Sequence, residues 1–329
     1  MTNADELARP KMVDVFSDSD IDNDISTNPA GYTITELAGA DPRIVTLTSD
    51  MGRVLGSFRA AFPDRYIEMG IAETNTLSVA AGLAASGHRP YVFAMSSFGI
   101  LKCAEQIRTD IAYNHLPVTV VGRLTGLALG FFGTSHHAVE DVAIARSLTN
   151  MVVITPADSN AVIGLMRSTA GVDEPRYIRV AEGALPVYGE PPKLAFGKWP
   201  QLRSGTDISL IGHGMGAGLA VAAARQLAGR GVQADVYDAA FLKPHDEEAL
   251  LETARRIGRI LTIEEHNEVG GLTSIVAETL GRHGVSTRLG HCALPDQDLE
   301  VGTPAQLQEY YGLTPEGVVK RAEQLLADN

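Results

Sequence analysis

The chain has 329 residues, of which 45% are hydrophobic and 20% charged, a composition typical of a globular protein with room for two complete domains. Its net charge of −13 argues against a surface that binds nucleic acid or an anionic membrane. No apolar run approaches the roughly 20 residues of a membrane span, and the acidic N-terminus does not resemble a signal peptide, so we expect a cytoplasmic protein.

An acidic segment, residues 1–28, begins the chain, and its composition is typical of a flexible lead-in. Acids alternate with other residues over Ser17–Asp24, which at first sight resembles a calcium-binding loop. An EF-hand needs a glycine in mid-loop and a glutamate at its end, and neither is present. We therefore predict no metal site here.

The first strand is predicted at residues 44–48, after a short helix at 33–40, because its side chains are apolar or β-branched. Asp50 follows this strand closely. Since α/β proteins place binding groups at the carboxyl ends of parallel strands, Asp50 is either a binding residue or the cap of a turn or helix.

A second strand, at residues 66–69, runs into Gly70, which allows a tight bend into a helix. That helix is almost entirely small or apolar after its first turn, as expected for a buried helix. Glu73 is its only acid and is expected at the helix entrance, close to the interior. Its carboxylate either interacts with the free N–H groups of the first turn or exchanges a hydrogen bond with a basic nitrogen.

Phe98 follows the next predicted strand, at residues 90–95, and precedes a helix that reaches residue 113. An aromatic side chain between a strand and a helix suits a flat ligand, on which it can stack. The alternative is that Phe98 belongs to the hydrophobic core.

A Gly-rich loop, residues 123–137, follows the predicted strand at 118–122 and ends in His136-His137. Adjacent histidines project in different directions and no i,i+4 partner follows them, so we predict no zinc site here. Further elements are expected as a helix at 141–148 and strands at 151–155 and 175–180.

The strand–helix pattern restarts after a Pro-rich stretch at residues 186–200. The predicted strands lie at 207–211, 232–237, 260–264 and 286–289, and the helices at 219–228, 247–257, 272–283 and 315–326. Strands separated by helices imply mostly parallel sheets. We expect an α/β protein of two three-layer α/β/α domains, with the lead-in at 1–28, the first domain at 29–188, a linker at 189–202 and the second domain at 203–329.

The turn Gly212–Gly218 follows a strand, opens a helix and lies about 20 residues before Asp238, which meets the positional requirements of a dinucleotide-binding fingerprint. An NAD-linked oxidoreductase is therefore one alternative. The same glycines also serve wherever a strand turns tightly into a helix that lies on the sheet. The two cysteines, Cys103 and Cys292, follow no metal-ligand spacing and are expected to be free thiols.

The segment Gly70-Ile71-Ala72-Glu73, with Phe-Pro-Asp-Arg-Tyr before it and a small-residue helix after it, resembles the glutamate segment of transketolases. Relatives of that family include deoxyxylulose-phosphate synthase and the β subunits of 2-oxo-acid dehydrogenases. The similarity extends over Glu105–Arg108, the loop ending at His136, Phe241–Pro244 and Glu264–Leu272. It implies a pyrimidine-binding domain followed by a transketolase C-terminal domain.

The resemblance implies thiamine diphosphate as the cofactor. Glu73 would hold N1′ of its aminopyrimidine, so that the 4′-imino group can remove the thiazolium C2 proton, and Phe98 would stack on the same ring. Asp50 and Ile71 match further cofactor-binding positions.

On the substrate side, the resemblance implies that His136 reaches the oxygen beside C2 and that Arg179 contacts a substrate phosphate, unless Arg179 is a surface arginine. The family commonly has a histidine at Leu124 and Glu-Asp at Phe131-Phe132, where polar side chains bind sugar hydroxyls. An apolar site gains little from a polyol. The expected reaction transfers a two-carbon unit from a ketose or related keto donor to an aldehyde, and the alternative is acyl transfer from pyruvate or another 2-oxo acid.

Transketolases hold the cofactor diphosphate through a metal ion, with a Gly-Asp-Gly segment and a downstream asparagine. No Gly-Asp-Gly occurs in this chain. The resemblance therefore implies an N-terminal transketolase subunit as partner, which supplies Gly-Asp-Gly and Asn and holds Mg²⁺ or Ca²⁺, in an α2β2 assembly. The isolated chain is expected to show no thiamine diphosphate-dependent turnover.

Overall fold

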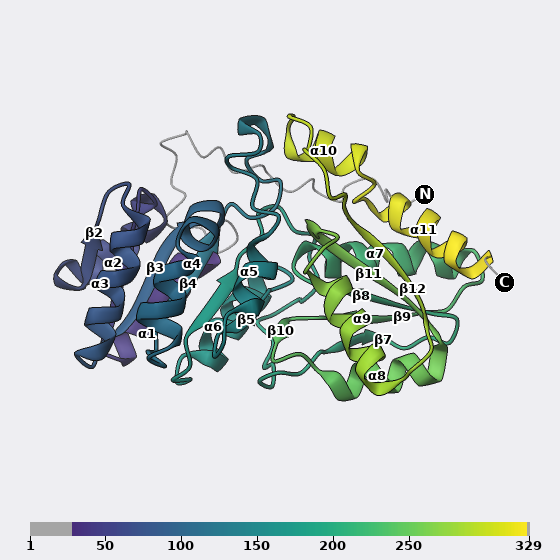
Figure 1. Ribbon diagram of the computed structural model, residues 1–329, viewed down its shortest axis with the longest axis horizontal. Coiled ribbons are helices and arrows are strands. Elements are labelled where there is room, and N and C mark those ends of the chain that lie inside the picture. Colours follow the sequence, from purple (N-terminus) through teal and green to yellow (C-terminus); the bar gives the residue numbers. More distant parts are fainter. Residues whose placement is uncertain (1–27, 328–329) are drawn as a thin grey trace.

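The computed structural model describes residues 28–327, so residues 1–27 of the predicted acidic lead-in, with Ser17–Asp24, lie outside the described residues, while its last residue, Asn28, caps α1 (Pro29–Ala40). The strands of this part form two sheets that lie side by side, one of seven strands and one of five (Figure 1). Helices lie on both faces of each sheet, in the three layers that the sequence predicts. None of the helices between residues 28 and 327 has both the length and the apolar character to cross a membrane.

The seven-stranded sheet has the order β10-β5-β6-β4-β3-β1-β2, and its neighbours are parallel except for β10 and β5. Its strands are β1 (Ile44–Thr48), β2 (Tyr66–Glu68), β3 (Arg89–Met95), β4 (Thr119–Arg123), β5 (Val152–Ile154), β6 (Arg176–Arg179) and β10 (Phe241–Lys243). The strands that belong to the first half of the chain lie within one or two residues of their predicted positions, because their β-branched runs are bounded by turn residues.

Two groups of helices cover this sheet, each with its own hydrophobic cluster. One face carries α3 (Glu73–Ala85), η3 (Ser97–Lys102), α4 (Ala104–Gln106), η4 (Ile107–Ala112) and α5 (Asp141–Ser147). The other carries α1 (Pro29–Ala40), α2 (Gly56–Ala61) and α6 (Ser159–Thr169). The helix predicted to end near residue 113 is instead two π-helical segments, η3 and η4, around the short α4. Such π-helical turns are frequent at functional sites.

The five-stranded sheet has the order β12-β11-β8-β9-β7, with β7 antiparallel at its edge. Its strands are β7 (Gln201–Arg203), β8 (Ile208–Gly212), β9 (Ala234–Asp238), β11 (Arg259–Asn267) and β12 (Arg288–Leu294). Helices α7 (Met215–Gly229) and α11 (Pro315–Ala327) cover one face, while α8 (Glu247–Ile257) and α9 (Leu272–His283) cover the other. Helix α10 (Pro304–Tyr310) lies close to the short helix η5 (Gly130–Phe132) of the first half.

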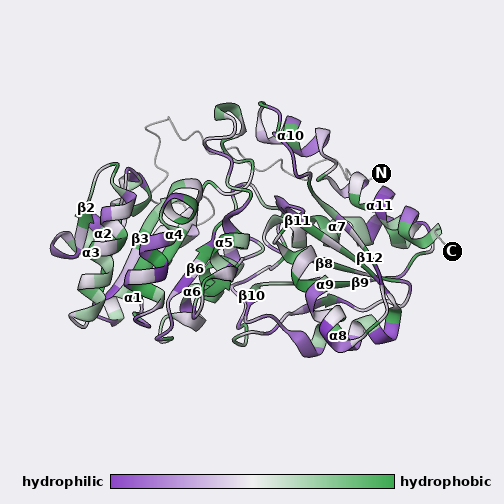
Figure 2. Cartoon of the chain, viewed as in Figure 1, coloured by the Kyte–Doolittle hydropathy of each residue, from purple (hydrophilic) through white to green (hydrophobic). Residues whose placement is uncertain are grey.

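Helix α8 has the bounds that its sequence predicts, because both of its ends are marked locally. The side chain of Asp246 accepts a hydrogen bond from the Ala249 N–H at the first turn, and Gly258 ends the helix in the left-handed conformation. Hydrophilic and hydrophobic residues alternate along α8, whereas the strands beneath it are mostly hydrophobic (Figure 2). This pattern buries one side of the helix and exposes the other.

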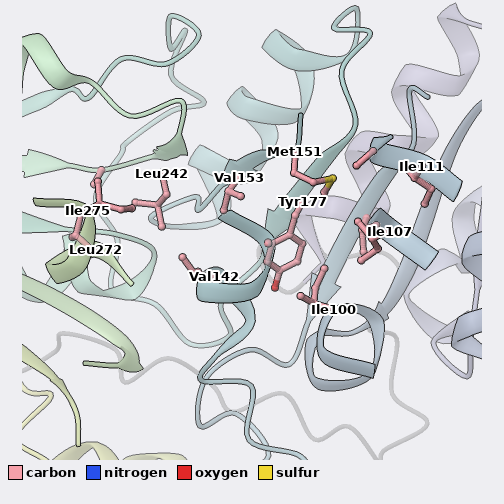
Figure 3. Close-up of a cluster of buried hydrophobic side chains, with 14 of the residues drawn as sticks. Ile100, Ile107, Ile111, Val142, Met151, Val153, Tyr177, Leu242, Leu272 and Ile275 are labelled. Atoms are coloured by element: carbon pink, nitrogen blue, oxygen red, sulfur yellow. The ribbon is translucent and has the colours of Figure 1, made fainter. Parts of the chain in front are cut away.

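The two halves of the chain share a hydrophobic core. Strand β10 comes from the second half of the sequence but completes the first sheet by pairing with β5. At the centre of this strand, Leu242 lies between Val142 and Val153 of the first half and Leu272 and Ile275 of the second (Figure 3). The boundary proposed at residues 189–202 thus assigns β10 to the second domain although the strand belongs to the first sheet.

Candidate functional site

The predicted site residues follow the carboxyl ends of the strands of the seven-stranded sheet. Strand β1 lies between β2 and β3, so the chain leaves β1 toward one side and leaves β3 toward the other. Such a reversal is where α/β sheets bind ligands. Asp50 follows β1, Glu73 follows β2 and Phe98 follows β3, which brings these segments to one edge of the sheet.

Glu73 is the first residue of α3 and is only 5% exposed. Gly70, with φ of +67°, makes the turn between β2 and this helix, which is a conformation that L side chains rarely adopt. The Glu73 Oε2 atom accepts a hydrogen bond from Nζ of Lys102 at 2.9 Å. The carboxylate is therefore largely out of water and bound to a nitrogen donor.

Lys102 is the last residue of η3, one helical turn after Phe98, and half of its side chain is exposed. The hydrogen bond to Glu73, together with the charge of that carboxylate, raises the pKa of the Lys102 ammonium. A half-exposed lysine on a flexible stem can leave its partner at small cost. Of the two contacts predicted for Glu73, the structure shows the one with a basic nitrogen, and its cofactor role stays a prediction.

Phe98, His136 and Phe132 form an aromatic cluster at the carboxyl ends of β3 and β4. The edge of one ring meets the face of the other between Phe98 and His136, with centroids 5.2 Å apart, and Phe132 stacks on His136 at 4.6 Å. The Ser135 hydroxyl lies 2.9 Å from His136 Nδ1. These contacts fix the plane of the imidazole and leave Nε2 as the nitrogen on the opposite side of the ring.

The Gly-rich loop that carries His136 has a defined base. Gly126 and Ala138 form an isolated antiparallel bridge, with both N–H···O distances at 3.0 Å. Leu124 precedes this base at φ +54° and is buried in the core cluster of the α1 and α6 face. Its predicted contact with substrate stays a prediction. At the tip of the loop Phe132 is 47% exposed, so it lies open to solvent as a substrate-binding side chain would.

Arg179 is not a surface arginine, because its side chain is 1% exposed. Its Nε donates to Oδ2 of Asp141 at 2.8 Å, and Nη2 donates to the backbone oxygens of Ala138 and Glu265. Burial is the largest single influence and disfavours the charged guanidinium, but Asp141, Tyr177 and Glu265 together outweigh it, so the pKa of Arg179 is raised. The guanidinium is thus occupied within the chain, and its predicted contact with a substrate phosphate has no support from this geometry.

Asp50 and Ile71 lie on the surface at the edge of the sheet. Asp50 has φ of +57° and its backbone N–H donates to Glu68 Oε1 at 3.3 Å. The Ile71 side chain is 77% exposed. An exposed apolar side chain next to a buried carboxylate suits contact with another molecule, and the cofactor roles of both residues stay predictions.

The glycines of the Gly212–Gly218 turn serve packing. A Cβ at Gly212 would overlap the backbone of Gly216, and one at Gly216 would overlap the carbonyl oxygen of Ile263. Asp238, which a dinucleotide site would use for a ribose, accepts a hydrogen bond from the Tyr188 hydroxyl at 2.8 Å. The turn therefore brings α7 close to the sheet, and the structure does not favour nucleotide binding.

Within residues 28–327, no group of three or more His, Cys, Asp or Glu side chains is arranged to hold a metal ion. Cys103 and Cys292 are free and buried, and burial raises the pKa of each thiol to about 12. They are therefore structural thiols with little thiolate character.

The sequence does not predict the contacts of three residues in the site region, Lys102, Asp141 and Glu265. Lys102 has no local signal that would pair it with Glu73, 29 residues away in the sequence. Asp141 was predicted as the first residue of a helix, and its burial beside Arg179 has no local signal. The adjacent acids Glu264-Glu265 on an otherwise apolar strand were the available signal, because buried carboxylates need partners.

Two family models match consecutive parts of the chain. Residues 27–187 match the transketolase pyrimidine binding domain, and residues 197–318 match the transketolase C-terminal domain. These matches confirm the prediction of two α/β domains of this type.

Curated relatives fall into two length classes. The chain is 36% identical over 294 residues to a subunit of the apulose-4-phosphate transketolase of Phocaeicola vulgatus, covering 88% of this chain and 94% of the relative. It is 34% identical over 295 residues to a subunit of the 6-deoxy-6-sulfo-D-fructose transketolase of Clostridium sp. strain MSTE9, covering 89% and 91%. It is 38% identical over 301 residues to 1-deoxy-D-xylulose-5-phosphate synthase of Symbiobacterium thermophilum, covering 90% of this chain but 46% of the synthase. The chain thus spans about half the length of the synthases that it matches.

Among solved structures, a split gene transketolase described as an inactive beta4 tetramer superposes with a TM-score of 0.81 at 34% identity, over 90% of this chain and 96% of that chain. A transketolase of Pichia stipitis in complex with sedoheptulose 7-phosphate superposes with a TM-score of 0.73 at 21% identity, over 92% of this chain and 45% of that chain. The second likeness shows a common fold.

Proposed function

The chain belongs to the transketolase family, and from this membership we propose that it is the pyrimidine-binding and C-terminal subunit of a two-component transketolase. The observation that carries the proposal is that relatives of matching length are named as transketolase subunits. The assembled enzyme would transfer a two-carbon unit from a keto donor to an aldehyde. Acyl transfer from a 2-oxo acid is not favoured, since those relatives are transketolases.

The proposed partner is an N-terminal transketolase subunit with Gly-Asp-Gly and a downstream asparagine, which would hold Mg²⁺ or Ca²⁺ and the cofactor diphosphate. The proposed assembly is a cytoplasmic α2β2 heterotetramer. The exposed Ile71, two residues before the buried Glu73, supports an interface at this edge of the sheet.

Thiamine diphosphate, when bound, supplies the carbon nucleophile that cleaves the bond beside a donor carbonyl. Glu73 would hold its ring nitrogen through the carboxylate oxygen that now accepts a hydrogen bond from Lys102. Because burial removes competition from water, that hydrogen bond would be stronger than one at the surface. Phe98 would position the ring by stacking, with Asp50 and Ile71 at its margin.

His136 is proposed to bind the donor carbonyl oxygen or to move its proton. Ser135 holds Nδ1, and the rings of Phe98 and Phe132 hold the imidazole plane, so Nε2 is the nitrogen available for this task. The buried Leu124 and the exposed Phe132 would make the donor side of the site apolar. Such a site supports a donor with fewer hydroxyl groups than an ordinary ketose.

The experiment that tests the proposal compares the purified chain, the N-terminal subunit alone, and the two co-expressed. Only the co-expressed pair is expected to cleave a ketose donor with thiamine diphosphate and Mg²⁺ and to pass the two-carbon unit to an aldehyde. Chromatographic analysis of the products measures this transfer. Mass photometry of the pair is expected to give the mass of two copies of each chain. Donor cleavage by the purified chain alone, or a pair that associates but never transfers carbon, would contradict the proposal.

Replacing Phe132 with aspartate is expected to shift donor preference of the assembled pair toward polyhydroxylated ketoses, because a carboxylate can pair with hydroxyls that a phenyl ring leaves unpaired. The ratio of kcat/KM for a polyhydroxylated donor to that for a deoxy donor should rise on the order of tenfold. Tyr113→Asp, an equally drastic change at a side chain that is 80% exposed on another part of the chain, is the control. An unchanged donor profile in Phe132→Asp would contradict the proposal that the site prefers donors with few hydroxyl groups.

A further inference from the structure

The loop that carries His136 and Phe132 is attached to the second half of the chain at its base. The bridge between Gly126 and Ala138 closes the loop. Side chains on β11 and α10 approach this bridge from the other sheet, and Gly302 N–H also donates to the Gly130 oxygen at the loop tip. The position of the loop base therefore determines where His136 and Phe132 lie.

The Glu265 carboxyl lies directly against this base. Glu265 is 4% exposed, and Gly126 has so little space beside it that a Cβ there would overlap Glu265 Oε2. The Leu127 N–H donates to the carboxyl, and Gln308 Nε2 of α10 donates to Oε1 at 3.2 Å. The carboxyl thus bonds to the loop on one side and to the second half of the chain on the other.

Arg179 also links the loop base to the second half of the chain. Its Nη2 donates to the Ala138 oxygen, at the end of the loop base, and to the backbone oxygen of Glu265. Asp141 holds the guanidinium in place through Nε. Because one buried guanidinium binds backbone oxygens from both halves of the chain, it links the loop base to β11 at the residue whose side chain contacts the loop.

We propose that Glu265 is a positioning residue that holds the His136 loop in register through its contacts with the Leu127 N–H and with Gln308. Its consequence for catalysis rests on the function proposed above, whereas the hold on the loop is a property of this chain alone. The role is distinct from that of Glu73, because Glu265 contacts the loop backbone and Gln308, whereas Glu73 binds Lys102.

The surroundings of Glu265 make its hold on the loop base dependent on pH. Burial raises the pKa of the Glu265 carboxyl to about 7, although Arg179 of β6 and the hydrogen bonds from Gln308 and Leu127 act in the opposite direction, and Asp141 of α5 adds to the rise. A group whose pKa is raised on folding contributes stability that is complete below its unfolded pKa. That stability is lost as pH rises through the folded pKa. The hold on the loop base is therefore expected to weaken progressively from about pH 4.5 to about pH 7 and to level off at higher pH.

The test is hydrogen–deuterium exchange of the purified chain, read on peptides covering residues 124–138 and corrected for the intrinsic pH dependence of amide exchange. Between pH 6 and pH 8 the opening constant of these amides should rise about tenfold in the wild type. The isosteric Glu265→Gln variant should remove this rise, and Glu265→Ala, which removes the contact at every pH, should give fast exchange at both. Glu309→Gln, an exposed acid on the same helix as Gln308, should behave as the wild type.

Equal pH dependence in the wild type and Glu265→Gln would overturn the proposal, as would protection that does not change with pH in the wild type. A second readout uses the assembled enzyme, in which Glu265→Gln should shift the alkaline limb of the kcat profile while KM for the cofactor stays the same. If the exchange result holds and the assembled pair has no activity, the positioning role stands and the proposed function fails. The two failures are therefore distinguishable.

Discussion

Replacing Glu73 with glutamine is expected to lower donor cleavage by the assembled pair by roughly 10²–10⁴-fold, the usual contribution of a positioned acid or base. Glutamine keeps the size of the side chain but has no charge to favour protonation of a ring nitrogen. Glu73 is buried at the start of α3, so the substitution changes a side chain that is largely shielded from solvent. Stopped-flow measurement of a single donor turnover isolates this step from product release.

Two variants separate this role from general damage to the site. Lys102→Met removes the nitrogen donor that now occupies Glu73 Oε2, and it should retain donor cleavage within about tenfold, because the lysine is half exposed and the carboxylate remains. Asp64→Asn changes an exposed acid in the turn before β2 and should have no effect. If Glu73→Gln cleaves donor at the wild-type rate, the proposed cofactor contact is wrong.

Replacing Arg179 with methionine is expected to destabilise the chain by about 3–5 kcal/mol, because it leaves the fully buried Asp141 carboxylate without its ion-pair partner. It also removes the donor that joins the backbone oxygens of Ala138 and Glu265. Urea unfolding followed by circular dichroism measures the loss as a lower midpoint.

Arg167→Met is the matched control, since the Arg167–Glu36 pair is exposed on both sides and should contribute less than about 1 kcal/mol. The experiment also distinguishes the two roles considered for Arg179. A residue that contacts only a substrate phosphate would raise KM and leave the free energy of unfolding unchanged. A change of less than about 1 kcal/mol in Arg179→Met would refute the structural role.

The residues proposed to contact the cofactor lie at one edge of the first sheet. The aromatic cluster, Glu73 and Asp50 gather at one edge of the first sheet, whereas no arrangement of acids or histidines within the described residues suits a metal ion. The comparison with relatives named as subunits supports the proposed division of the enzyme between two chains.

The local elements are predictable from the amino-acid sequence because their signals lie within a few residues of each other. Helix α8 has its predicted bounds since Asp246 and Gly258 mark its ends. The strand at residues 44–48 is found at the predicted positions, and Gly70 does make the turn that leads to Glu73. The family pattern around Glu73 is likewise a local one.

The pairing of distant residues, in contrast, depends on how the layers of the fold pack. Lys102 meets Glu73 across 29 residues, Arg179 meets Asp141 across 38 and the Glu265 oxygen across 86, and β10 leaves its own half of the chain to complete the first sheet. A local pattern specifies which face of an element is apolar, but the packing of whole layers selects the side chain that a buried charge meets. For this reason the family, the elements and the acid at the start of α3 can be recognised from the residues alone, while folding turns the predicted substrate arginine into the link between the two halves of the chain.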